Sequence, residues 1–219
     1  MKLSANTIQV LKNFAQINPS IIFKPGNVIR TISPTKTIFA TATVEETFES
    51  SFAIYELSKF LSVLSLFNDP ELIIKDTHVT IKSGTKKLNY TFASTSVIVA
   101  PPTKNIDLPS IDAEFELSNE TLVDAQKGAS VLKLPEIAFV GDGSKVTIQA
   151  IDQKNSSGDN YQIDVGESEK TFKAIFKQEN INFLPGAYNV TISKKGISHF
   201  KSEKIEYFVA VESTSQFDS

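Results

Sequence analysis

The sequence predicts an α+β protein built from two similar domains. Each half of the 219-residue chain alternates in the same order between a helix, a group of strands, a second helix and a second group of strands. Short segments also recur in the same order: the VTI of residues 79–81 returns at residues 190–192, and the YTFA of residues 90–93 resembles the YFVA of residues 207–210. An internal duplication accounts for both observations.

An extended connector is predicted between the halves. Three of the nine prolines lie within residues 98–110, and a proline removes a backbone donor and disfavours a helical conformation at the residue before it. This stretch is therefore expected to be neither a helix nor a central strand. We expect three parts: a first domain at residues 1–100, a connector at residues 101–110 and a second domain at residues 111–219.

The first half is predicted to contain two amphipathic helices, over residues 4–17, with Ser4 or Asn6 as the cap, and over residues 56–67. Apolar residues recur at helical spacing on one side of each, and the opposite sides carry Lys12 and Lys59 among neutral polar residues, without an acid. The predicted strands are residues 21–23, 28–32, 38–44, 48–54, 71–75, 79–82 and 88–93.

The second half is predicted to contain a third helix, capped by Ser118 and running to about Leu132. A short fourth helix is expected over residues 177–184, before Pro185. A turn is expected at residues 140–143 and a solvated loop at residues 152–159. The predicted strands are residues 115–117, 145–151, 172–176, 188–193 and 205–211.

The composition is that of an ordinary globular protein, with 41% hydrophobic and 21% charged residues. No apolar run is long enough to predict a membrane span, and residues 1–10 lack the apolar core of a signal peptide, so a cytosolic location is expected. The absence of cysteine excludes disulfides and thiolate metal sites. A net charge of −3 argues against a protein that coats DNA nonspecifically, but it allows lysines to be concentrated on one face.

No pattern in the sequence predicts an enzyme. The only two histidines, His78 and His199, are isolated and are expected at the surface, which leaves no usual zinc set. There is no phosphate-binding glycine-rich loop and no nucleophile elbow. We therefore predict no catalytic, cofactor-binding or metal-binding residue.

Segments distributed along the whole chain form a recognisable series, in order and in spacing: 1–4, 11–18, 53–69, 99–101, 185–188 and 207–212. In this series the chain resembles the phage DNA polymerase processivity factors, the sliding clamps of contractile-tailed phages. The resemblance implies the DNA clamp fold, in which two similar domains per subunit build a homotrimeric ring with helices lining the hole and sheets outside. It also implies that the ring encircles duplex DNA and tethers the polymerase during phage DNA replication in the host cytoplasm.

The resemblance further implies three protein partners: the DNA polymerase, an ATP-hydrolysing clamp loader and late-transcription factors. It implies no cofactor. Subunits are expected to meet head to tail through edge strands, for which residues 88–93 and 172–176 are the candidates, because unpaired edges invite pairing.

A protein that slides on DNA needs positive charge in its hole, because phosphate contacts attract without reading sequence. The predicted DNA-facing residues are Lys2, Lys12, Lys59, Lys127, Lys133 and Lys177. Lys12 and Lys59 are the clearest, on their acid-free helix faces. Glu120 and Asp124 share the polar face of the third helix, which makes Lys127 a weaker candidate.

A groove for a partner peptide is predicted beside the connector. Ile106 and Leu108 are apolar residues on an extended segment, and Val209 and Val211 are expected to share one face of the last strand. With Pro109, these residues form the candidate groove. The alternative is that Ile106 and Leu108 merely attach the connector to the two domains.

A second hypothesis is a β-rich phage structural protein of a tube or baseplate, which would also be acidic, free of cysteine and oligomeric. The acid-free helix faces and the duplicated order of helices and strands favour the clamp, since a structural protein needs no lysine-lined inner face.

Overall fold

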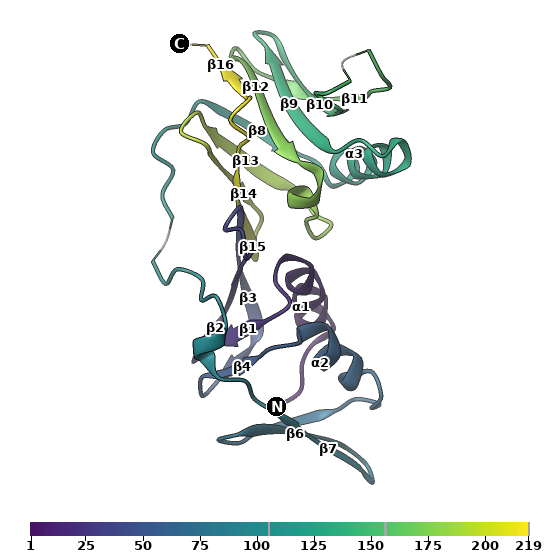
Figure 1. Cartoon of the computed structure of the whole chain (residues 1–219), viewed down its shortest axis with the longest axis vertical. Coiled ribbons are helices and arrows are strands. Elements are labelled where there is room, and N and C mark those ends of the chain that lie inside the picture. The colour runs from purple at the N-terminus through teal and green to yellow at the C-terminus, as the bar shows by residue number, and fades with distance from the viewer. Residues whose placement is uncertain (105, 156, 219) are drawn as a thin grey trace. The chain divides into compact units, whose positions relative to one another are not determined.

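The computed structural model describes residues 1–104, 106–155 and 157–218. The chain divides into two compact units, Met1–Thr103 and Lys104–Ser219, and the division falls within the stretch that was predicted as a connector (Figure 1). Each unit combines helices with antiparallel sheets, which confirms the α+β class. Within the described residues, no helix has both the length and the apolar character needed to cross a membrane.

The first unit contains two α-helices and three antiparallel groups of strands. β1 pairs with β4, β2 pairs with β3, and β5, β6 and β7 form a meander in which β7 is an edge. The elements are α1 (Ala5–Ile17), β1 (Ile21–Phe23), β2 (Gly26–Ile32), β3 (Ile38–Phe48), β4 (Phe52–Ile54), α2 (Leu57–Leu64), β5 (Glu71–Ile74), β6 (His78–Ser83), β7 (Lys86–Thr91) and the 3₁₀ helix η1 (Thr95–Val97).

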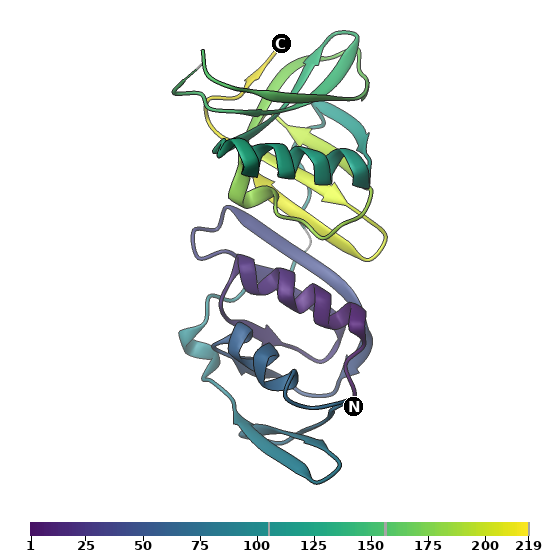
Figure 2. The same ribbon diagram turned by 90° about the vertical axis from the view of Figure 1, so that its right-hand side faces the viewer.

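Aromatic rings fill the core of this unit. Phe23 of β1 lies 4.7 Å from Phe48 and 4.6 Å from Phe52 between ring centroids, so three strands meet at one cluster. The helices add their apolar stripes, with Phe14 of α1 and Phe60 of α2 buried. The two helices lie side by side on one side of the strands (Figure 2), and this packing turns their polar stripes outward.

The amino-terminal end of α1 is attached to β3 through a carboxylate. The Ser4 hydroxyl accepts from the Thr7 backbone amide at 3.1 Å, as an N-cap does. Glu46 of β3 accepts hydrogen bonds from the Ser4 backbone amide and from the Thr7 hydroxyl. Burial alone raises the pKa of Glu46, but these hydrogen bonds outweigh it and hold the pKa below its usual value.

The second unit contains one α-helix and two sheets. One sheet has the order β11-β10-β9-β12-β16, and within this unit the other has the order β15-β14-β13-β8. The elements are β8 (Ala113–Leu117), α3 (Asn119–Leu132), β9 (Glu136–Asp142), β10 (Lys145–Ile151), β11 (Tyr161–Glu167), β12 (Thr171–Lys177), the 3₁₀ helix η2 (Gln178–Ile181), β13 (Tyr188–Ser193), β14 (Ile197–Lys201), β15 (Ile205–Ala210) and β16 (Gln216–Phe217).

Phenylalanines from both sheets join in the core of the second unit. Phe139 of β9 lies 5.1 Å from Phe115 of β8 and 6.0 Å from Phe200 of β14, between ring centroids. Phe176 of β12 lies 5.9 Å from Phe200. These pairs hold the two sheets face to face, while α3 packs against β9, β10 and β11 through buried leucine and alanine side chains.

The predicted fourth helix is wrong. Lys177 ends β12 with an extended backbone, and only the four-residue η2 follows it. The segment is held by side chains of the second unit: Gln126 of α3 donates to the Ile181 carbonyl at 2.6 Å, and the Tyr207 hydroxyl accepts from the Leu184 amide at 3.1 Å. These fixed contacts over a few residues leave no room for a regular α-helix.

The strand predictions also need correction. Residues 48–54 are not one strand, because β3 ends at Phe48 and β4 begins at Phe52. Residues 172–176 were expected to form a free edge, but β12 lies between β9 and β16, and Ile175 is hydrogen-bonded to Ser215 and Glu212. The two edges of this sheet are the short β16 and the longer β11, and sequence patterning missed β11 because its residues are mostly polar.

Replacing Glu46 with glutamine is expected to lower the free energy of unfolding by about 1 kcal/mol at neutral pH, because the cap loses its carboxylate acceptor and Glu46 is only partly shielded from solvent. A lowered folded-state pKa means that this contribution is present above the unfolded pKa of a glutamate, about 4.3, and is lost as the pH falls through the folded pKa. Urea unfolding of the parent and of Glu46→Gln should therefore differ at pH 7 and converge as the pH falls below the lowered folded-state pKa of Glu46.

Glu45→Gln is the matched control, because the neighbouring Glu45 is exposed. Its unfolding free energy should stay close to that of the parent at both pH values. An equal loss in the two variants would contradict a specific role for Glu46.

Candidate functional site

The exposed stripe of α1 carries one cation and no acid. Gln9, Lys12 and Gln16 follow at helical spacing and are all exposed. Lys12 forms no ion pair within the described residues. The stripe therefore offers a single unpaired charge among neutral polar groups, which is suited to weak contact with phosphates.

The face around Lys59 was expected to be free of acids, and the structure shows that it is not. Glu56 stands one residue before α2, and its carboxylate lies 3.0 Å from the Lys59 ammonium group. The hydrogen bond from Lys59 to Glu56 raises the pKa of Lys59, so this lysine stays charged while its charge is partly neutralised. Lys2 is also paired, with Asp69.

The other predicted lysines occupy different settings. On α3, Lys127 lies 3.6 Å from Asp124, and Glu120 is exposed on the same helix. Lys133 is the carboxyl-terminal cap of α3 in the left-handed conformation, with φ 54°. Lys177 ends a strand rather than starting a helix. The outer face of α3 is therefore mixed in charge, unlike that of α1.

The predicted groove residues have unequal access to solvent. Ile106, Leu108 and Val211 are partly exposed and Pro109 is exposed. Val209 is 0% exposed, so its side chain belongs to the core. Strand alternation does not relate Val209 to Val211, because β15 ends at Ala210.

The carboxyl-terminal end of the connector is fixed to a turn by Asp112. Its carboxylate accepts from the Lys194 backbone amide at 2.9 Å and from the Ser110 hydroxyl, which also lies 2.7 Å from Ser193. Burial alone raises the pKa of Asp112, but the hydrogen bonds from Ser110 and Lys194 outweigh it and lower the pKa. Ile111, which lies between Ser110 and Asp112, is 65% exposed and was missed by the sequence analysis. Its exposed apolar side chain between two polar anchors was the available signal.

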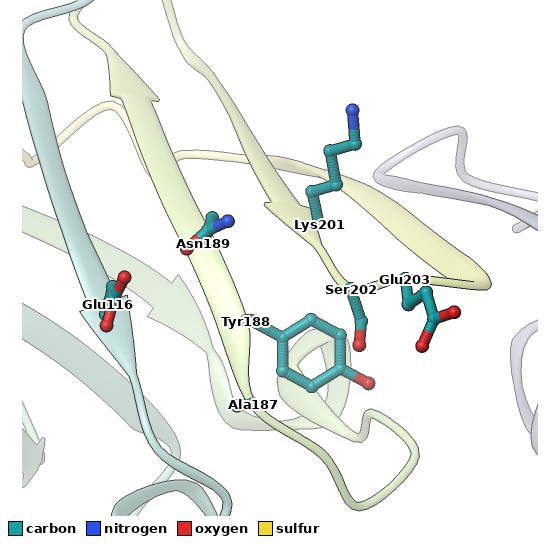
Figure 3. Close-up of a pocket in the computed structure, with 7 residues that line it drawn as sticks. All are labelled: Glu116, Ala187, Tyr188, Asn189, Lys201, Ser202 and Glu203. Atoms are coloured by element: carbon teal, nitrogen blue, oxygen red, sulfur yellow. The ribbon is translucent and has the colours of Figure 1, made fainter.

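An open hollow of about 380 Å³ lies at the sheet of the second unit (Figure 3). Glu116, Asn189 and Lys201 face each other across neighbouring strands there, and Tyr188 lies beside them. The Tyr188 hydroxyl donates to the Leu184 carbonyl at 2.7 Å, and burial raises its pKa, so it is occupied and neutral.

Histidine takes no part in a cluster that could bind a metal. Among residues 1–104, 106–155 and 157–218, no group of three or more His, Cys, Asp or Glu side chains is arranged to hold an ion. His199 is more buried than the sequence suggested: its ring stacks on Phe208 at 4.2 Å, and Nε2 lies 2.7 Å from a Glu206 carboxylate oxygen. Burial lowers the pKa of His199.

Comparison with known proteins gives the same result for both halves of the chain. A family model described as "DNA polymerase processivity factor" matches residues 3–100, and one described as "gp45 sliding clamp, C terminal" matches residues 114–213. The sliding clamp of Vibrio phage KVP40 is 36% identical, over 97% of this chain and 99% of that protein. The sliding clamp of Enterobacteria phage T4 is 32% identical over all of both chains.

Solved structures confirm the DNA clamp fold. The proliferating cellular nuclear antigen of Entamoeba histolytica superposes with a TM-score of 0.70 at 15% identity, over 94% of each chain. The Helicobacter pylori beta clamp in complex with 5-chloroisatin also gives a TM-score of 0.70 at 15% identity, over 100% of this chain and 65% of that one. The sequence relatives favour a clamp over the tube or baseplate alternative. With both halves matched and relatives aligned along the full length, the chain belongs to the phage sliding clamps, the DNA polymerase processivity factors.

Proposed function

We propose that three copies of this chain close into a ring around duplex DNA and that the ring tethers the DNA polymerase during phage replication in the host cytoplasm. The full-length similarity to phage sliding clamps is the observation that carries this proposal. The ring performs no chemistry of its own. A clamp loader that hydrolyses ATP opens and closes it, and late-transcription factors bind it as the polymerase does.

The first edge that we assign to subunit contact is β7. Lys86 and Lys87 are exposed at its start, and the Lys86 ammonium group lies 3.4 Å from the Leu66 carbonyl oxygen. The Leu66 side chain is 63% exposed. The edge strand thus offers unpaired backbone groups, two positive charges and an exposed apolar side chain.

The second edge is β11, in the other unit. Asp164 and Glu167 are exposed on this strand, although the Lys145 ammonium group 3.1 Å away neutralises part of the charge of Asp164. Tyr161 packs so closely on Gly128 of α3 that a Cβ atom there would clash with its ring. Val131, three residues after Gly128 on α3, is 79% exposed. This edge offers unpaired backbone groups, negative charges and exposed apolar side chains.

The two edges complement each other in charge and in apolar surface. A contact between the first edge of one subunit and the second edge of the next is heterologous, and it builds a ring when the rotation closes. Each subunit uses both edges once, which leaves neither strand available for open-ended pairing.

In the ring, Lys12 meets DNA phosphates from α1. An isolated cation on a neutral face attracts DNA without a fixed grip, which sliding requires. Lys59 contributes less because Glu56 neutralises part of its charge. Four lysines remain secondary candidates. Lys2 and Lys127 are paired with acids, Lys133 caps the end of α3, and Lys177 ends a strand.

A terminal peptide of the polymerase binds beside the connector, at Ile106, Leu108, Pro109 and Val211, and Ile111 joins this groove. Asp112 keeps the connector against the β13–β14 turn, and the Val211 amide donates to Gly196 in the same turn at 3.0 Å. The partly exposed aliphatic side chains supply anchors of the kind that dominate peptide binding.

Reversing charge at either edge is expected to weaken the trimer. Lys86→Glu with Lys87→Glu, or Glu167→Lys with Glu169→Lys, should each raise the dissociation constant about three- to tenfold, because surface charge pairs are worth up to about 1 kcal/mol. Glu169 is an exposed residue just after β11. Combining the two pairs should restore assembly in part. Sedimentation velocity measures the trimer fraction, with Glu114→Lys on β8 as the control. Unchanged assembly in every variant would remove β7 and β11 from the contact.

For DNA, Lys12→Glu is expected to shorten retention on nicked circular DNA after loading, and Lys59→Glu should have a smaller effect. The slope of log affinity against log salt should become shallower by about one for each phosphate that the variant no longer neutralises. Lys75→Glu, at an exposed turn, is the control for net charge. Equal retention in the parent and Lys12→Glu would place α1 away from DNA.

The groove is tested with Leu108→Ser, Ile111→Ser and Val211→Ser, each assayed by calorimetry with the terminal peptide of the polymerase. Loss of an apolar anchor should weaken binding about tenfold while the trimer persists. Val97→Ser changes an apolar residue outside the groove that is about as exposed as Ile111, and it should bind as the parent does. If the three groove variants also match the parent, the peptide binds elsewhere.

A further inference from the structure

A hollow of about 230 Å³ in the first unit lies apart from the groove proposed above. Strands β1 and β2, the turn between them and the residues that follow the unit's last strand form its walls. The lining residues are Ile22, Lys24, Pro25, Val28, Arg30, Pro101, Pro102 and Thr103. The hollow is smaller than the roughly 300–1,000 Å³ of sites for drug-sized ligands, so it suits an end group or one or two side chains.

Arg30 presents an unused hydrogen-bond donor at this hollow. Its Nη1 donates to the Thr103 carbonyl at 2.7 Å, which attaches the chain near the connector to β2. Its Nε atom is buried and has no partner within the described residues. A buried donor without an acceptor destabilises the structure, so an acceptor that reached Nε after a small rotation of the side chain would be bound favourably.

The lining selects one kind of acceptor. It contains two cationic side chains, Arg30 and Lys24, and no acid. The remaining wall is aliphatic or proline, which disfavours a fully hydrated polyanion such as a DNA backbone. The Nε and Nη2 edge of a guanidinium matches the two oxygens of a carboxylate.

We propose that this hollow is a second protein-binding site, which receives a carboxylate carried next to an apolar side chain on a peptide of a partner protein. The carboxylate pairs with Arg30 and Lys24, and the apolar group packs on Val28 and the two prolines. Because Arg30 also holds Thr103, the bound peptide is fixed beside the start of the connector. The inference deepens the tethering function proposed above by adding an anchor in the first unit.

The test uses the ¹⁵N-labelled full-length protein and three small probes. N-acetylleucine carries a terminal carboxylate, N-acetylleucinamide has none, and N-acetylglutamyl-leucinamide carries its carboxylate on a side chain. Each is titrated while the Arg30 Nε–H signal and the backbone amide signals of Val28 and Thr103 are followed by NMR; the amide signals give the affinities of the Arg30 variants. N-acetylleucine should shift this signal saturably, and the amide should bind at least about tenfold more weakly, as expected for loss of a charge-assisted hydrogen bond.

The glutamyl probe distinguishes the two sources of the carboxylate. If the glutamyl probe binds as tightly as N-acetylleucine, the site is assigned to acidic side chains within a peptide. If it binds more weakly than N-acetylleucine, the site is assigned to a free chain end. Arg30→Gln should weaken the binding of the tighter carboxylate probe about tenfold, and Arg30→Lys should keep only part of the parent's affinity for it. Lys75→Gln, the control, should bind the probe as the parent does.

Equal affinity of the acid and amide probes, equal affinity of Arg30→Gln and the parent, or no saturable shift with any probe would overturn the proposal. Trimer assembly and DNA retention of Arg30→Gln are measured alongside. Both should equal those of the parent, since Arg30 lies on β2 and not on β7 or β11, the strands proposed for subunit contact, nor on α1. A failure of the ring proposal would appear in those two assays and in the edge variants, independently of the probes.

Discussion

Burial of aromatic rings is the interaction on which the remaining features of this chain depend. The chain has sixteen phenylalanines, and in each unit they join elements that are separated in sequence, as Phe23, Phe48 and Phe52 do in the first. Because the apolar stripes of α1 and α2 are committed to such a core, their polar stripes must face outward. The position of Lys12 on the surface follows from that packing and needs no separate cause.

Two different electrostatic tasks are separated within one chain of net charge −3. In the function proposed above, sliding requires weak attraction without fixed partners, and we assign that attraction to the neutral face around Lys12. Assembly requires complementarity, and the lysines of β7 and the carboxylates of β11 supply that at the proposed edges. The pairing of Lys59 with Glu56 and of Lys127 with Asp124 shows that the number of lysines on helices overstates the charge available to DNA.

Sequence patterning predicted the elements whose signal is local. The three α-helices have strong 3.6-residue periodicity, and Ser4 and Ser118 are caps as expected. The patterning failed where tertiary contacts decide the structure. Contacts from Gln126 and Tyr207 hold the segment after Lys177 in a short 3₁₀ turn, and the polar strand β11 exists only through pairing with β10. For the site, it placed Glu56 at the start of the second helix but overlooked that this carboxylate, three residues before Lys59, would pair with it. It also placed Val209 on one face with Val211, although Val209 is buried and β15 ends before Val211.

The connector illustrates how the two ends of a segment without regular structure are attached, each to its own unit. Its prolines exclude a helix, but they do not determine where the chain goes. Arg30 holds Thr103 in the first unit, and in the second Asp112 attaches to Lys194 and to the serines at positions 110 and 193. Both attachments use hydrogen bonds to or from a charged side chain, and such hydrogen bonds are stronger than those between neutral groups. Ile106 and Leu108, which lie shortly before the second attachment, are partly exposed, and partly exposed apolar side chains on an extended segment can offer a binding surface.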